Sequence, residues 1–154
     1  MGLMDLVKKA FLGATDEENR KNKEKMRAIF NDSVPNGDDY KLIYCHSEDT
    51  TNAVVVKVTK HSNFIVGYKE GEVVVIAVSP DLSEYDNPIV FNKDNGSNTE
   101  TRLGYCRVYN EKYSFQFEPI TYAPGIAKGA KHSVAITQSG SEVAEFRNFF
   151  KKGL

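Results

Sequence analysis

Short apolar runs separated by turn residues dominate the chain between Lys41 and Phe117. Two of them, Val54–Val58 and Val73–Val78, consist mostly of β-branched residues, which suit a pleated surface and fit poorly in a helix. The second run carries no charge and shows no alternation with polar residues, a pattern typical of strands covered on both sides. The pattern predicts an antiparallel sheet in which Val73–Val78 is buried on both faces.

The strands are predicted at residues 40–46, 53–59, 64–69, 72–79, 89–91, 99–108, 112–118 and 132–137. The first four are expected to form a meander because short turns join them. Gly71 supplies the positive φ that a tight hairpin needs, and Asn95-Gly96 marks another turn. In the last predicted strand, Val134 and Ile136 are expected to point inward.

Two helices are predicted before the sheet. Residues 2–12 have apolar positions at helical spacing, and Gly13 ends that segment. Thr15 and Glu18 then form a capping box that begins a second helix. This second helix is polar for three turns and apolar only near its end, at Met26, Ile29 and Phe30. We expect it to dock through that end.

The chain closes with a helix that has clear signals at both ends. Ser139 is expected to cap it, with Glu142 three residues later, Ser141 is a competing cap, and Gly153 is expected to end it. Its apolar stripe is Val143, Phe146, Phe149 and Phe150. Such a stripe must be buried, so the helix is expected to close the sheet.

Together these elements predict a mainly β (α+β) fold, an antiparallel β-sandwich or partly open barrel of seven or eight strands. The expected organisation is an N-terminal helical segment at residues 1–31 and an antiparallel β domain with the C-terminal helix at residues 40–152. A length of 154 residues is sufficient for one such domain with its own core.

The order of elements over residues 40–152, together with the opening Met1-Gly2-Leu3-Met4-Asp5-Leu6, resembles the pleckstrin-homology-like (PH-like) superfold, in particular its small bacterial members. The resemblance implies a bent sheet sandwich closed at one end by the C-terminal helix. The tryptophan common in the last helix of eukaryotic members is absent, since the chain contains no Trp. No functional residue carries over.

Charge and cysteine usage narrow the functional classes. Twenty basic and 21 acidic residues leave a net charge of −1, which argues against general affinity for nucleic acid. Cys45 and Cys106 fall in predicted strands and are expected to be buried, reduced thiols. The chain shows neither a signal-peptide pattern nor a membrane-length apolar run. It is therefore expected in the cytoplasm, with a peripheral site at the inner membrane face as the alternative.

The residues that could carry chemistry are scattered. The histidines, His46, His61 and His132, do not form a zinc-ligand pattern with the cysteines, so we expect no catalytic residue, metal or cofactor. The segment 125–133 is richer, because its small residues expose backbone N–H groups beside Lys128, Lys131 and His132. These three residues are a candidate contact for an anion or a lipid headgroup, and an ordinary solvated loop is the alternative.

The N-terminal segment presents a candidate apolar face made of Leu3, Met4, Val7 and Phe11, next to Lys8 and Lys9. Such a face could lie in a membrane interface, or it could pack on the sheet or on another subunit. Residue 6 is Leu, where an N-myristoylation signal requires Ser or Thr.

The sequence favours a non-enzymatic binding or scaffold module that offers a loop rim or a sheet edge to a protein partner or to a second copy. A peripheral membrane protein that uses the N-terminal helix and the lysine-containing loop is one alternative, and a small enzyme with an unrecognised site is another. No small-molecule substrate suggests itself.

Overall fold

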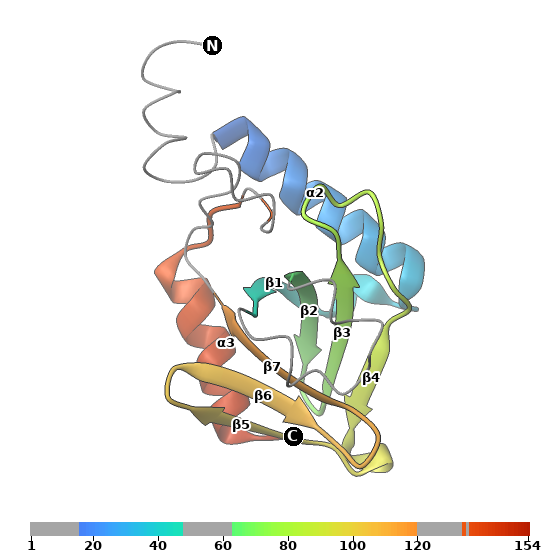
Figure 1. Cartoon of the computed structure of the whole chain (residues 1–154), viewed down its shortest axis with the longest axis vertical. Helices are drawn as coiled ribbons and strands as arrows, with labels where there is room; N and C mark the ends of the chain where they lie inside the picture. Colours follow the sequence, from blue (N-terminus) through green and yellow to red (C-terminus); the bar gives the residue numbers. More distant parts are fainter. Residues whose placement is uncertain (1–15, 48–62, 120–133, 135) are drawn as a thin grey trace.

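The structure is a computed structural model that describes residues 16–47, 63–119, 134 and 136–154. In this part of the chain, one antiparallel sheet of seven strands is accompanied by two α-helices (Figure 1). The helices are α2 (Asp16–Ser33) and α3 (Gly140–Lys152), and the strands are β1 (Lys41–His46), β2 (Asn63–Lys69), β3 (Glu72–Val78), β4 (Ile89–Asn92), β5 (Asn98–Arg102), β6 (Tyr105–Tyr109) and β7 (Ser114–Pro119). Short 3-10 turns η1 (Gly37–Asp39) and η4 (Lys93–Asn95) complete it. The mainly β, antiparallel class predicted from the sequence is confirmed.

The strand order is β4-β3-β2-β1-β7-β6-β5. The sheet therefore consists of a meander β1–β4 and a meander β5–β7 that meet where the ends of β1 and β7 pair. Figure 1 shows β5–β7 turned across one end of β1–β4, with α3 beside β5 and β7 and α2 on the other side of the first meander.

The valine-rich strand β3 is buried on both faces, as predicted. Val73, Val75 and Ala77 belong to the apolar cluster on the α3 side of the sheet. Val74, Ile76 and Val78 belong to a second apolar cluster, on the α2 side. Because both faces are covered, the strand has no need for polar residues at alternate positions.

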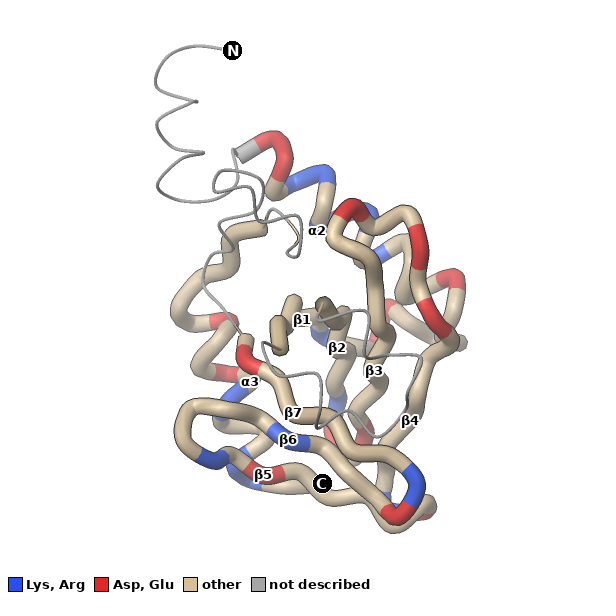
Figure 2. Tube along the Cα trace, in the orientation of Figure 1, with Lys and Arg blue, Asp and Glu red and all other residues tan. Residues whose placement is uncertain are grey.

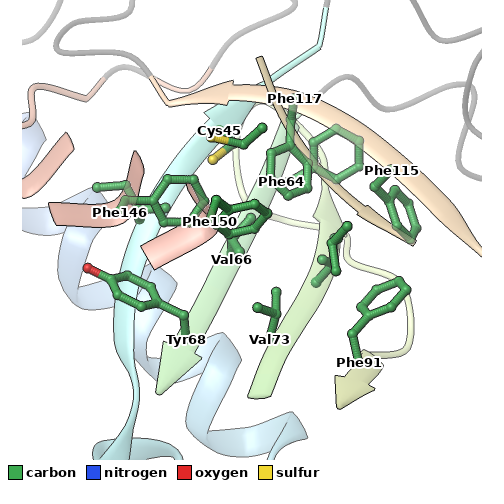
Figure 3. Packing of buried hydrophobic residues seen from close by; sticks show 14 of the residues in the cluster. Cys45, Phe64, Val66, Tyr68, Val73, Phe91, Phe115, Phe117, Phe146 and Phe150 are labelled. Carbon is green, nitrogen blue, oxygen red and sulfur yellow. The ribbon is translucent and has the colours of Figure 1, made fainter. Parts of the chain in front are cut away.

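Phenylalanines fill the cluster on the α3 side (Figure 3). Phe146 and Phe150 of α3 are fully buried, with ring centroids 4.6 Å apart. Phe150 lies 5.9 Å from Phe117 of β7, and Phe146 lies 5.3 Å from Tyr68 of β2. The predicted stripe of α3 therefore joins the two meanders into one core.

The ends of α3 follow the predicted signals. The Ser139 side chain accepts a hydrogen bond from the backbone N–H of Glu142 at 3.1 Å. Gly153 ends the helix with a φ of 92°, a conformation that glycine adopts without a steric penalty.

The helix α2 docks through its C-terminal half, also as predicted. Met26, Ile29 and Phe30 are buried in the cluster on the α2 side, while the surface ion pairs Glu17–Lys21 and Arg20–Glu24 lie along its earlier turns. The predicted helix at residues 2–12 and the capping residue Thr15 lie outside the described residues.

The prediction of one long strand at residues 99–108 is wrong. These residues form a hairpin, β5 and β6, joined by Leu103 and Gly104 with φ values of 51° and 87°. Two-residue hairpin turns with positive φ at both positions usually carry Asn or Asp before Gly. Leu103 lacks that signature, so the turn was not recognised.

The predicted strand 53–59 lies outside the described residues, and β1 pairs directly with β2 along its whole length. Within the predicted strand 132–137, Val134 and Ile136 are fully buried as expected. The described residues of that stretch nevertheless form no named strand.

Candidate functional site

One edge of β1 is only partly paired within the described part of the chain. β2 covers one edge of β1 from Lys41 to His46, whereas β7 pairs with the other edge only at Cys45 and His46. The rest of that second edge needs partners from elsewhere, because an unpaired strand edge presents free N–H and C=O groups.

A side-chain amide takes the place of a strand at Tyr44. The Tyr44 N–H donates to Gln138 Oε1 at 2.7 Å, and Gln138 Nε2 donates to the Tyr44 carbonyl at 3.0 Å. The backbone N–H and C=O of Tyr44 therefore both face away from β2. Gln138 is only 4% exposed, so its amide stands in for the peptide group of a neighbouring strand.

The fold holds Gln138 firmly at this position. Val134 and Ile136, which precede Gln138 in the chain, are buried in the core. The Thr137 N–H donates to Asn19 Oδ1 of α2 at 2.8 Å. Ser139 then begins α3. The amide is thus fixed between the two helices, where it reaches the edge of β1.

Arg27 of α2 covers the other end of the same edge. Its guanidinium donates to the carbonyls of Tyr40 at 2.9 Å and Gly37 at 2.8 Å. Since arginine remains charged at any ordinary pH, this contact also places a permanent positive charge beside β1.

Leu42 lies between these two covered positions. Peptide groups alternate along an antiparallel strand, so the N–H and C=O of Leu42 face the same way as those of Tyr44. Among the described residues, none forms a hydrogen bond to these two groups of Leu42. Within the described residues, one peptide unit of the β1 edge is therefore open.

A hollow of about 270 Å³ lies over this open position. Its lining comes from α2, β1, the residues just before α3, and α3 itself: Lys23, Met26, Arg27, Leu42, Ile136, Gln138 and Glu142. Sites for drug-sized ligands usually measure about 300–1,000 Å³. We call this hollow, together with the open edge at its lining residue Leu42, the β1 slot.

A second hollow, of about 450 Å³, lies between β4 and the β6–β7 turn. Asn95 covers part of the β4 edge beside it: its Nδ2 donates to the Val90 carbonyl at 2.7 Å, and its Oδ1 accepts from the Asn92 N–H at 3.1 Å. The β1 slot is the better candidate because, among the described residues, both the N–H and the C=O of Leu42 lack a partner.

The described residues that line the β1 slot include none of the site candidates taken from the sequence. Lys128, Lys131 and His132, and the face made of Leu3, Met4, Val7 and Phe11, lie outside the described residues, so their roles stay predictions. His46 ends β1, where it pairs with Asn63 of β2 and Glu118 of β7. Within the described ranges, no group of histidine, cysteine or acidic residues could hold a metal ion.

The two cysteines are free and fully buried. Burial, followed by the neighbouring Cys106, raises the pKa of the Cys45 thiol well above its ordinary range. Burial also raises the pKa of Cys106, to about 12. Thiolates, not thiols, are nucleophiles, so both groups act as small apolar side chains.

Sequence reasoning missed the residues that form the β1 slot, although one signal was present. Gln138 continues the inward positions of Val134 and Ile136, and a polar residue at an inward position must find a hydrogen-bond partner. Nothing local indicates that the partner is the β1 edge.

Comparisons with known protein families, with curated proteins and with solved structures found no match to this chain. Within the described part of the chain, neither helix is long and apolar enough to cross a membrane.

Proposed function

We propose that this chain is a non-enzymatic binding module, built on a PH-like scaffold, that binds an extended segment of a protein partner at the β1 slot. The observation that carries the proposal is the open peptide unit of Leu42, set in a hollow between two covered neighbours. Addition of a strand to a free sheet edge is a recurrent mode of peptide recognition.

The PH-like assignment draws on the order of strands and the place of the last helix. A four-stranded and a three-stranded meander meet at the ends of β1 and β7. The helix α3 inserts its aromatic stripe between them. Both features agree with a bent sandwich closed by a C-terminal helix.

The edge alone gives a weak contact. A partner residue opposite Leu42 would form two backbone hydrogen bonds, one donated and one accepted. At about 0.5–1.5 kcal/mol net for each bond, the pair contributes about 1–3 kcal/mol, less than the roughly 4 kcal/mol of a millimolar complex. The side chains lining the slot must therefore supply the remaining affinity and the selectivity.

The test is a selection of displayed random heptapeptides on the full chain, followed by a comparison of two variants. Leu42→Pro removes the free N–H without removing a bond to β2, and proline is tolerated at such edge positions. Leu42→Val shortens the side chain but keeps the N–H. We expect selected peptides to bind wild type and Leu42→Val and to lose binding to Leu42→Pro.

Peptides that bind all three proteins equally would contradict the proposal. Circular dichroism shows whether Leu42→Pro folds. If it does not, the test instead follows the chemical shift of the Leu42 amide in wild type as peptide is added. Binding without a shift at Leu42 would contradict the proposal as well.

A further inference from the structure

The charges around the β1 slot are not balanced. Its lining contains two cationic side chains, Lys23 and Arg27, and one carboxylate, Glu142. The chain as a whole has nearly equal numbers of basic and acidic residues, and Figure 2 shows both signs distributed along α2. The excess of positive charge is therefore local to the slot.

Arg27 carries most of this imbalance. Its guanidinium is partly buried and, among the described residues, bonds only to neutral carbonyl oxygens, those of Gly37 and Tyr40. No carboxylate among the described residues lies within ion-pair distance of it. A partly buried charge without an opposite charge costs free energy, and an anion in the slot would reduce that cost.

Lys23 lies one turn earlier on α2, on the same face of the helix as Arg27. Its ammonium group is 3.8 Å from Glu142, and both side chains are more than a third exposed. A pair at this distance and exposure contributes little. Lys23 can therefore leave Glu142 and pair with a carboxylate of a ligand without a large loss of free energy.

The position of these cations fits one kind of ligand. Arg27 holds the carbonyl of Tyr40, two residues before Leu42, so a residue that pairs with Leu42 lies close to both cations. Neighbouring side chains of an added strand point to opposite faces. Only the side chains on the α2 face of the added strand can thus approach Lys23 and Arg27.

We propose that the β1 slot selects an extended peptide with an acidic side chain on its α2 face, held by Lys23 and Arg27. This inference rests on the proposed function, since it names the chemical class of the peptide that the same edge binds. The backbone of Leu42 fixes the peptide as a strand, and the two cations select its charge.

The test uses three synthetic pentapeptides with blocked ends, Val-Thr-Glu-Thr-Val and the versions with Gln or Lys at the centre. Blocked ends remove the terminal charges. Each peptide is titrated into the full-length protein at low salt, and the shift of the Leu42 amide signal reports binding. We expect the Glu peptide to bind about three- to tenfold more tightly than the Gln peptide, and the Lys peptide to bind least.

Two surface variants test whether these charges cause the selectivity, because they should change the preference for the Glu peptide in opposite directions. Lys23→Glu should abolish the preference for the Glu peptide, and Glu142→Gln should increase it. Both side chains are more than a third exposed, so both variants should keep the fold. Adding salt to 0.5 M should reduce the preference in wild type, because salt screens exposed charges.

Different failures separate the two proposals. Equal binding of the Glu and Gln peptides, unchanged in Lys23→Glu, would overturn the charge selectivity while leaving the edge site intact. Absence of a Leu42 shift with all three peptides would overturn both. If the Leu42 amide is already protected from exchange in the free protein, the chain itself covers the edge, and both proposals fail.

Discussion

Gly67 of β2 lies directly under the ring of Phe30 of α2, so closely that a Cβ atom at position 67 would overlap the ring. The same atom would be 3.2 Å from the Leu42 side chain. Phe30 is fully buried and cannot move away easily. The missing side chain at position 67 is thus what allows α2 to approach the sheet.

Gly67→Ala should therefore destabilise the protein, although alanine itself fits a strand. Overpacking of this kind typically costs about 1–3 kcal/mol, and urea unfolding measures it. Gly140→Ala is the matched control, because a Cβ at position 140 meets nothing within 4 Å. An unchanged free energy of unfolding for Gly67→Ala would show that α2 does not pack on β2 in this way.

Phe146→Ala should cost a large part of the stability. The ring is fully buried and contacts Tyr68, Phe117 and Phe150, and truncation of a buried phenylalanine costs about 3–5 kcal/mol. Lys151→Ala on the exposed side of α3 should change little. Melting of Phe146→Ala within a degree or two of wild type would mean that α3 displays its aromatic side chains outward.

The parts of the fold that the sequence predicts well are those with local signals. The β-branched run at Val73–Val78 and the phenylalanine spacing of α3 each reflect burial within one element. The hairpin at Leu103-Gly104 was missed because leucine is a rare choice at positive φ. Its conformation depends on the pairing of β5 with β6, not on the turn residues.

The β1 slot could not be predicted for a different reason. Tyr44 and Gln138 are 94 residues apart in the sequence, and their contact depends on where β7 stops pairing with β1. Register and strand order depend on contacts that are distant in sequence. The hypothesis of a sheet edge as a binding surface came from the sequence, but the identity of the edge required the structure.

Asp81 should make stability depend on pH in acid. Ser83 donates two hydrogen bonds to its carboxylate and Ser79 donates one, which lowers the pKa of Asp81 to about 2. A carboxyl group with a folded pKa below its unfolded value, near 3.9, stabilises above that value and loses this effect as pH falls toward the folded pKa.

The measurement is the melting temperature of wild type and Asp81→Asn across pH. Wild type should melt higher than the variant at pH 6, and the difference should shrink between about pH 4 and pH 2. A difference that is constant over that range would assign the effect to packing rather than to the charge.

Cys45 and Cys106 should be unreactive in the folded protein. Both thiols are fully buried and have raised pKa values. A chromogenic disulfide reagent at pH 8 should leave the native protein unmodified for many minutes and should react with both thiols after unfolding in urea. Rapid reaction of either thiol in the native protein would show that the core between β1, β6 and β7 opens readily.

The open edge at Leu42 is tested most directly by hydrogen exchange of single amides along β1 in the full-length protein. The Ile43 N–H bonds to β2 and the Tyr44 N–H bonds to Gln138, so both should exchange slowly, while the Leu42 N–H should exchange much faster. In Gln138→Leu, exchange at Tyr44 should become fast, and exchange at Ile43 should remain slow. A Leu42 amide as protected as that of Ile43 would contradict the open edge and the binding function built on it.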